Sequence, residues 1–240
     1  EQLQGISRIK DDFLYSVTHE LRSPLTAIRA QIEIIRDDAE EMPAEVRNSF
    51  LDATIEECVR LTNLISNVLD IEKFESGNQQ LSFKKINLKE MTERVMETHW
   101  ALSVNEGVRM SFSGPESAMV SADEDRLQQV FVNLVSNALK YAEDSLSILI
   151  DSKQRKGKEY WCVRISDDGP GVPPSDVEYL FEKFYQSRDQ TIKKRQGSGL
   201  GLAISYNIIK AHGGKLTLSS NPPEGQTTFS FTLPKITDHE

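Results

Sequence analysis

Apolar side chains recur every three or four positions through the first part of the chain. The series is Ile6, Ile9, Phe13, Val17, Leu21, Leu25, Ile28, Ile32 and Ile35. This spacing predicts one long helix with a single buried stripe, because one helical turn contains 3.6 residues. A second series follows the polar segment 39–45, at Phe50, Thr54, Cys58, Leu61, Ile65 and Val68. Residues 1–77 are therefore predicted to form a helical hairpin that ends at Ser76 and Gly77.

The two predicted helices present more apolar surface than one hairpin can cover. A symmetric pair of hairpins would bury both stripes in a four-helix bundle, so we expect a homodimer. The spacing of four between Phe13, Val17, Leu21 and Leu25 departs from a heptad and implies a local change of supercoil.

Beyond Gly77 the apolar pattern changes to short segments separated by glycine, proline and polar residues. This pattern predicts an α+β domain over residues 78–240. Helices are expected at 87–103, 123–141 and 200–212, and a capping box of Asn87 and Glu90 opens the first of them. Strands are expected at 81–83, 108–112, 119–122, 146–151, 160–166, 216–219 and 227–233. The pairs 146–151 with 160–166 and 216–219 with 227–233 are predicted hairpins.

Composition narrows the class of protein. The chain has 240 residues, 38% of them hydrophobic, which is enough for packed cores. Its net charge of −9 argues against nucleic acid as a partner, because no basic excess replaces phosphate counterions. No apolar run approaches the roughly 18 residues that a membrane-spanning helix needs. Cys58 and Cys162 are expected to be two buried thiols of a protein in a reducing compartment.

His19 is an unusual residue for the first predicted helix. It lies about 200° around the helix from both Val17 and Leu21, so its imidazole is expected to face away from the buried stripe. Pro24 removes a backbone hydrogen bond and typically costs about 3 kcal/mol inside a helix. An outward histidine followed by Glu20 and a strained helical segment looks like a phosphorylation site.

Two asparagines, Asn133 and Asn137, share one face of the predicted helix 123–141. An amide oxygen is a suitable ligand for Mg²⁺, and Lys140 near the end of the helix could reach anionic phosphates. The alternative is a helix with two ordinary hydrogen-bonding amides.

Asp167 stands at the end of a predicted strand and is followed by Gly169 and Gly171. An ionised carboxylate only accepts hydrogen bonds, so it suits the amino group of adenine. Glycine lets the backbone approach a ligand closely. The alternative is a solvent-exposed turn, because aspartate, glycine and proline are common turn residues.

The glycines at 197, 199 and 201 come directly before a predicted helix, where backbone N–H groups can hold phosphate. The preceding segment 181–195 carries Arg188, Lys193, Lys194 and Arg195 and is expected to form a mobile basic lid over a nucleotide. The alternative for the lid is a solvated run of charge.

Together and in this order, these segments resemble the transmitter region of two-component sensor histidine kinases. The resemblance covers nearly the whole chain. The H box corresponds to 19–25, the N box to 133–141, the first glycine box to 167–171, the F box to 181–185 and the second glycine box to 197–201. The resemblance implies a dimerisation and histidine-phosphotransfer domain at 1–77. An ATP-binding two-layer α/β sandwich, of the kind shared with gyrase, MutL and a heat-shock chaperone, would follow at 78–240.

The resemblance also implies a role for individual residues. His19 would accept a phosphoryl group from ATP, and Glu20 would act as the base. Ser23 stands where many members have threonine or asparagine and would assist dephosphorylation of the partner protein. Asn137 would bind Mg²⁺. The nucleotide would be bound by Asn133, Asn137, Lys140, Tyr141, Asp167, Gly169, Gly171, Phe184, Gly197, Gly199, Leu200 and Gly201.

By the same resemblance, the chain would act as a homodimer and pass the phosphoryl group from His19 to an aspartate on the receiver domain of a response regulator. It would be the cytoplasmic portion of a bacterial sensor protein, connected to the membrane only through segments before Glu1. Two alternatives stay open. One is an ATPase of the gyrase or chaperone kind, against which the outward His19 argues. The other is a non-catalytic scaffold, against which the intact asparagines, Asp167 and glycines argue.

Overall fold

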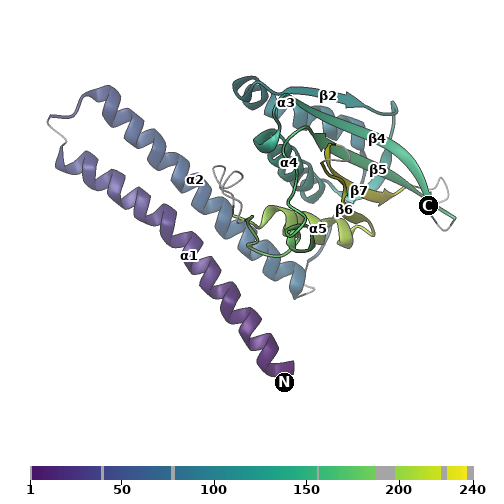
Figure 1. Cartoon of the computed structure of the whole chain (residues 1–240), viewed down its shortest axis with the longest axis horizontal. Helices are drawn as coiled ribbons and strands as arrows, with labels where there is room; N and C mark the ends of the chain where they lie inside the picture. Colours follow the sequence, from purple (N-terminus) through teal and green to yellow (C-terminus); the bar gives the residue numbers. More distant parts are fainter. Residues whose placement is uncertain are drawn as a thin grey trace. The chain divides into compact units, whose positions relative to one another are not determined.

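The chain consists of two compact units, Glu1–Gly77 and Asn78–Glu240. The computed structural model describes residues 2–38, 41–76, 79–155, 157–187, 198–222 and 226–236. Figure 1 labels the helices and strands of both units.

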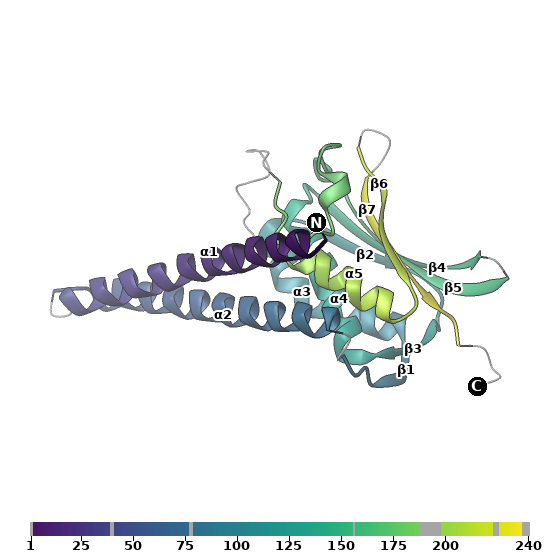
Figure 2. The same ribbon diagram turned by 90° about the horizontal axis from the view of Figure 1, so that it is seen from below.

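The first unit is a helical hairpin of α1 (Gln2–Asp37) and α2 (Ala44–Glu75). The two helices lie side by side along their length, as Figure 2 shows. The Thr54 hydroxyl on α2 donates a hydrogen bond to the side-chain oxygen of Gln31 on α1, at 2.9 Å. Helix α1 continues through Pro24 without a break. The predicted helical hairpin is confirmed.

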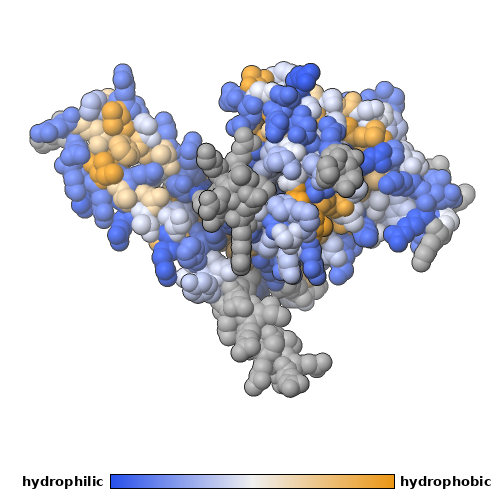
Figure 3. Space-filling view, in the orientation of Figure 1, coloured by the Kyte–Doolittle hydropathy of each residue, from blue (hydrophilic) through white to orange (hydrophobic). Residues whose placement is uncertain are grey.

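One hairpin leaves two positions of the predicted α1 stripe exposed among the side chains that the structure describes; those of Ile6, Ile9 and Phe13 lie outside that part. Leu25 is 59% exposed and Ile32 is 51% exposed, because the single neighbouring helix covers only one side of α1. Figure 3 shows hydrophobic side chains gathered on the surface of the hairpin near the turn between its helices. The predicted burial of Cys58 is wrong for the same reason, since this thiol is exposed on α2. Cys162 in the second unit is buried, as predicted.

The second unit is a two-layer α/β sandwich, which confirms the predicted fold class. Its main sheet has the strand order β2-β4-β5-β7-β6, and β1 pairs with β3 in a smaller sheet. Helices α3, α4 and α5 lie on one face of the main sheet (Figure 2). The elements are β1 (Phe83–Asn87), α3 (Leu88–Glu106), β2 (Arg109–Ser113), β3 (Met119–Asp123), α4 (Glu124–Tyr141), β4 (Ser145–Arg155), β5 (Lys158–Asp167), the short 3₁₀ helix η1 (Val177–Tyr179), α5 (Gly201–Ala211), β6 (Lys215–Ser220) and β7 (Thr227–Pro234).

The strand pairing confirms both predicted hairpins. β4 pairs antiparallel with β5, and β6 pairs antiparallel with β7. β5 also pairs antiparallel with β7, in a register that places Asp167 opposite Thr227. The β2–β4 pair is parallel. Because β5 is the central strand of the main sheet, its end lies near the middle of the sheet, where helices cover one face.

The core lies between the main sheet and the helices. Leu146, Ile148 and Ile150 alternate along β4 and are almost fully buried, because successive side chains of a strand point to opposite faces. Phe131 of α4 meets Phe231 of β7 edge to face, with ring centroids 5.3 Å apart. Fully burying a side chain of this size stabilises a fold by roughly 1.5–3 kcal/mol.

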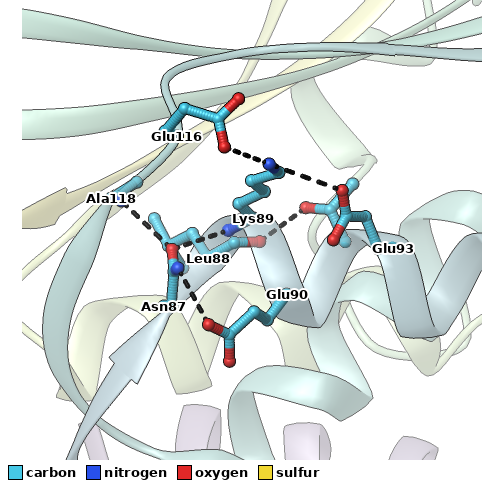
Figure 4. A network of polar contacts seen from close by, with 8 residues as sticks. Asn87, Leu88, Lys89, Glu90, Glu93, Glu116 and Ala118 are labelled. Atoms are coloured by element: carbon cyan, nitrogen blue, oxygen red, sulfur yellow. Dashed lines mark hydrogen bonds and ion pairs between the residues drawn. The ribbon is translucent and has the colours of Figure 1, made fainter.

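The start of α3 is held by the network in Figure 4. Asn87 accepts hydrogen bonds from the backbone N–H groups of Lys89, at 3.2 Å, and Ala118, at 3.1 Å. Its side-chain amide donates to Glu90 at 3.1 Å, so Glu90 binds the side chain of Asn87 rather than its backbone N–H. The Lys89 ammonium lies 2.6 Å from Glu116. Asn87 therefore caps α3 and ties it to the residue before β3.

Several predicted boundaries differ from the structure; β4, for example, continues to Arg155 rather than ending at Asp151. The strand expected at 81–83 is β1, which begins at Phe83 and ends at Asn87. Only Ile86 of β1 is buried, so the strand does not show a strong apolar pattern. Helix α3 ends at Glu106 rather than Ser103, because Gly107 adopts a φ of 72° and terminates it. Within the described residues, no helix is long and apolar enough to cross a membrane.

Candidate functional site

His19 lies on α1 with an exposed side chain, as its position predicted. Its imidazole makes no hydrogen bond to any residue that the structure describes. Glu20 is half-buried, and Ser23, one turn further along the helix, is exposed. The helix therefore presents an imidazole that can act as a nucleophile, with a carboxylate next to it in the chain.

The two asparagines of α4 differ in their surroundings. The Asn133 amide donates to the Gly201 carbonyl at 3.3 Å and to the Ser205 hydroxyl at 3.4 Å, which ties α4 to the first turn of α5. Asn137 is half-buried and makes no hydrogen bond within the described part of the chain. Asn137 therefore keeps an amide that can bind a ligand, while Asn133 also holds two elements together.

Lys140 and Tyr141 end α4 as half-buried residues. The Lys140 ammonium lies 5.1 Å from the centroid of the Tyr141 ring, within the range of a cation–π contact. The described residues contain no group of three or more His, Cys, Asp or Glu side chains that could hold a metal ion.

Asp167 is the last residue of β5 and is only 4% exposed. Its carboxylate accepts a hydrogen bond from the Gly169 N–H at 3.1 Å. Burial raises the pKa of Asp167 to about 6, although the Gly169 N–H and the nearby Thr227 hydroxyl act to lower it. The negative charge of Asp168 raises this pKa further. The carboxylate is therefore still mostly ionised at neutral pH, in a poorly solvated place.

Thr227 belongs to the same site, and sequence reasoning missed it. It lies opposite Asp167 in the β5–β7 pair. Its hydroxyl is buried and makes no hydrogen bond of normal length and angle to any described residue. A buried carboxylate and a buried hydroxyl with unused hydrogen-bonding capacity fit a polar, planar ligand such as adenine. The only sequence signal was that Thr227 opens the last predicted strand.

Two glycines of the first glycine box allow close approaches that a side chain would prevent. A β-carbon on Gly169 would collide with the Tyr141 carbonyl oxygen, so this turn packs directly against the end of α4. Gly171 has a φ of 85°, and a β-carbon there would lie 2.6 Å from Pro222. Asn221 holds the same turn through hydrogen bonds to the backbone of Val172, at 2.8 and 2.7 Å.

The F box packs against the second glycine box. Phe184 has a φ of 59°, which is a strained conformation for a large side chain. Its backbone lies against Gly199. Tyr185 stacks on Tyr179 with centroids 5.6 Å apart. Gly197 and the basic residues Arg188, Lys193, Lys194 and Arg195 of the predicted lid lie outside the described residues.

Helix α5 begins at Gly201, the last residue of the second glycine box. Leu200 precedes the helix, is fully buried and provides no side-chain cap. Because no side chain of the described residues caps this turn, its backbone N–H groups can bind an anion. The Asn133–Gly201 and Tyr141–Gly169 contacts bring α4, α5 and the end of β5 together.

Two family models match the chain. Residues 9–77 match the model described as His Kinase A (phospho-acceptor) domain. Residues 122–237 match the model described as Histidine kinase-, DNA gyrase B-, and HSP90-like ATPase.

Curated relatives match almost the whole chain. This chain is 31% identical over 232 residues to the sensor protein kinase WalK of Staphylococcus saprophyticus. The matched region covers 96% of this chain and 37% of that protein. A WalK sequence of Staphylococcus aureus has the same identity, with 55% of its length covered. The chain thus spans little more than a third of the first of these relatives and about half of the second.

Solved structures share the fold. The histidine kinase AdeS of Acinetobacter baumannii aligns with a TM-score of 0.72 at 23% identity, covering 91% of this chain and 98% of that one. The catalytic domain of the histidine kinase ThkA aligns with a TM-score of 0.51 at 30% identity, covering 65% of this chain and 99% of that one.

Proposed function

We propose that this chain, which belongs to the two-component sensor histidine kinases as a transmitter region, uses ATP to phosphorylate His19. In this proposal residues 1–77 form the dimerisation and phosphotransfer domain and residues 78–240 form the ATP-binding domain. The observation that carries the proposal is the presence, in one chain, of an exposed histidine and a pair of buried polar side chains, Asp167 and Thr227, that lie opposite each other on β5 and β7.

The ATP-binding domain would hold the nucleotide through groups from three elements. Asp167 would accept a hydrogen bond from the adenine amino group, supported by the buried Thr227 hydroxyl. The N–H groups at the start of α5 would bind phosphate, and Lys140 would add a positive charge near it. The Asn137 amide oxygen would bind Mg²⁺ together with phosphate oxygens, and the ion would neutralise charge that develops during transfer.

Chemically, a neutral His19 ring nitrogen would form a bond to the γ-phosphorus of ATP. The bond from that phosphorus to the bridging oxygen of ADP would break, and ADP would leave. The attacking imidazole must lose a proton, and Glu20 is the nearest carboxylate in the chain to accept it. In a second step an aspartate of a response regulator receiver domain would take the phosphoryl group from the histidine.

Labelling with γ-labelled ATP and Mg²⁺ tests this function. We expect acid-labile, base-stable label on the wild-type chain and none on His19→Gln. Equal labelling of both chains would overturn the assignment of His19. Release of inorganic phosphate without labelled protein would instead support an ATPase of the gyrase or chaperone kind.

A phosphatase activity toward the same response regulator is a second proposal. It is favoured by Ser23, which is exposed one helical turn from His19 and could orient a water molecule. The test is the rate of loss of label from a phosphorylated regulator with wild type and with Ser23→Ala. An unchanged rate would remove Ser23 from this role.

A further inference from the structure

Asp168 makes an unusually complete set of hydrogen bonds directly beside the proposed adenine-binding residue. One of its carboxylate oxygens accepts from the backbone N–H groups of Glu143, Asp144 and Ser145, at 3.0, 3.1 and 3.1 Å. The other oxygen accepts from the Ser145 hydroxyl at 2.8 Å. Asp168 therefore binds four donors that all belong to one short turn.

That turn joins the end of α4 to the start of β4. The backbone N–H of Asp168 also bonds to the Ser145 carbonyl, at 3.4 Å, and Gly169 packs against the Tyr141 carbonyl. Asp168 and Gly169 thus fasten the first glycine box to the last turn of α4. This turn of α4 carries Lys140 and Tyr141, and Asn137 lies one turn before it.

Asp167 and Asp168 are neighbours in the chain but have opposite environments. Asp167 is buried among few donors, and burial raises its pKa. Burial acts in the same direction on Asp168, but the Ser145 hydroxyl and the three backbone N–H groups outweigh it and lower the pKa of Asp168 to about 2. Asp168 is therefore ionised at every physiological pH, and its carboxylate is already saturated by donors of the protein.

We propose that Asp168 is a positioning residue for nucleotide binding: through the turn 143–145 it fixes the distance between Asp167 and the end of α4. This inference rests on the proposed function, because a nucleotide would have to reach Asp167 and the α4 residues at once. Charge-assisted hydrogen bonds to one carboxylate suit this role, since they are stronger than neutral ones and directional. Without Asp168 the two halves of the site would still exist, but their spacing would no longer be fixed before the nucleotide binds.

Asp123 offers a matched control at the other end of the same helix. Its carboxylate accepts from the backbone N–H groups of Arg126, at 3.1 Å, and Ser82, at 2.8 Å. Asp123→Ala therefore also removes a well-bonded aspartate, the N-cap of α4, but it leaves the end of α4 near Asp167 unchanged. A general loss of stability would affect both variants, whereas a loss of positioning would affect only Asp168→Ala.

The experiment measures ADP affinity by calorimetry and thermal stability for the full chain and its variants. We expect Asp168→Ala to bind ADP about tenfold more weakly at a temperature where it is folded, a change of about 1.4 kcal/mol. Asp168→Asn should stay within about threefold of wild type, because its amide oxygen can still accept from the three backbone N–H groups. Asp123→Ala should bind ADP as wild type does. In autophosphorylation, Asp168→Ala should raise the KM for ATP more than it lowers the rate at saturating ATP.

Several results would overturn the inference. One is ADP binding by Asp168→Ala within twofold of wild type, and another is an equal loss of affinity in Asp123→Ala. If Asp168→Ala does not fold, Ser145→Ala removes one of the four donors, and an unchanged ADP affinity in that variant would also count against the inference. A wild-type chain that does not bind ADP would overturn the proposed function as well, which separates the two failures.

Discussion

Gly199 lies directly against the backbone of Phe184. A β-carbon on Gly199 would stand 2.7 Å from the Phe184 carbonyl carbon, closer than carbon atoms approach each other without a bond. Both residues have positive φ, 67° for Gly199 and 59° for Phe184. The second glycine box and the F box can therefore adopt this arrangement only when position 199 has no side chain.

Gly199→Ala is expected to separate these two segments and to lower autophosphorylation at least tenfold. The substitution adds both the collision with Phe184 and the strain of a positive φ, which costs roughly 1–2 kcal/mol for a residue with a side chain. Gly107→Ala is the control, because Gly107 has a φ of 72° but no atom within 4 Å of the added carbon. The measurement is labelling at a fixed ATP concentration with thermal stability in parallel. Similar activity losses in the two variants would refute the prediction.

Asn133→Ala and Asn137→Ala are expected to differ in stability although both lower labelling. Asn133→Ala removes the hydrogen bonds from α4 to Gly201 and Ser205, which should cost about 1 kcal/mol of unfolding free energy. Asn137→Ala removes no hydrogen bond to a described residue, so its stability should stay within about 0.5 kcal/mol of wild type. Denaturant unfolding measures the difference. The prediction fails if Asn137→Ala is the less stable variant.

The buried carboxylate of Asp167 is expected to make the ATP-binding domain less stable as pH rises. Its folded pKa of about 6 lies above the unfolded value of 3.8, so the folded state holds more protons between these values. Stability contributed by the protonated form is therefore lost from about pH 4 to pH 6, by at most about 3 kcal/mol. Asp167→Asn cannot titrate and should lack this loss, while it should also bind ATP poorly.

Unfolding of wild type and Asp167→Asn at several pH values checks this sign. The difference in free energy between the two chains should change in favour of Asp167→Asn as pH rises from 4 to 6 and stay constant above about pH 7. A difference that does not change with pH would contradict the raised pKa.

Ile32→Glu is expected to weaken the proposed homodimer. Ile32 belongs to the apolar stripe of α1 and is 51% exposed in the single hairpin, so a second copy would have to bury it. A buried, unpaired carboxylate at that place should raise the dimer dissociation constant at least a hundredfold. Ala30→Glu places the same charge on an exposed position of α1 outside the predicted stripe and should leave the dimer intact. Sedimentation velocity at several concentrations distinguishes the outcomes.

Local sequence patterns predicted the elements with strong periodicity. The helices around His19 and Asn133 follow from spacing alone, because burial of one face imposes that spacing. Both hairpins of the main sheet were predicted from short apolar runs and the turn residues between them. The predicted burial of Cys58 was wrong, since a stripe position is buried only if another element covers it. The helix boundary at Gly107 needed the backbone conformation of a glycine, which the apolar pattern does not encode.

Residues that act through distant pairing were not predictable from local patterns. Thr227 joins Asp167 only through the register of β5 and β7, and Asp168 reaches a turn more than twenty residues earlier. The different surroundings of Asn133 and Asn137 depend on where α5 packs, which neither residue type reveals. The sequence therefore predicts a set of candidate site residues, and the tertiary contacts of each residue indicate its role.

The pairing of Asp167 with Thr227 has a consequence for how the sheet selects its register during folding. Thr228 follows Thr227, so a slip of β7 by one residue would still place a threonine hydroxyl opposite Asp167. The same slip would turn Phe231 and Leu233, both almost fully buried, away from the helices and bring Ser230 and Thr232 into the core. The Asp167–threonine pairing alone would tolerate both registers, and the aromatic and aliphatic side chains of β7 exclude the wrong one.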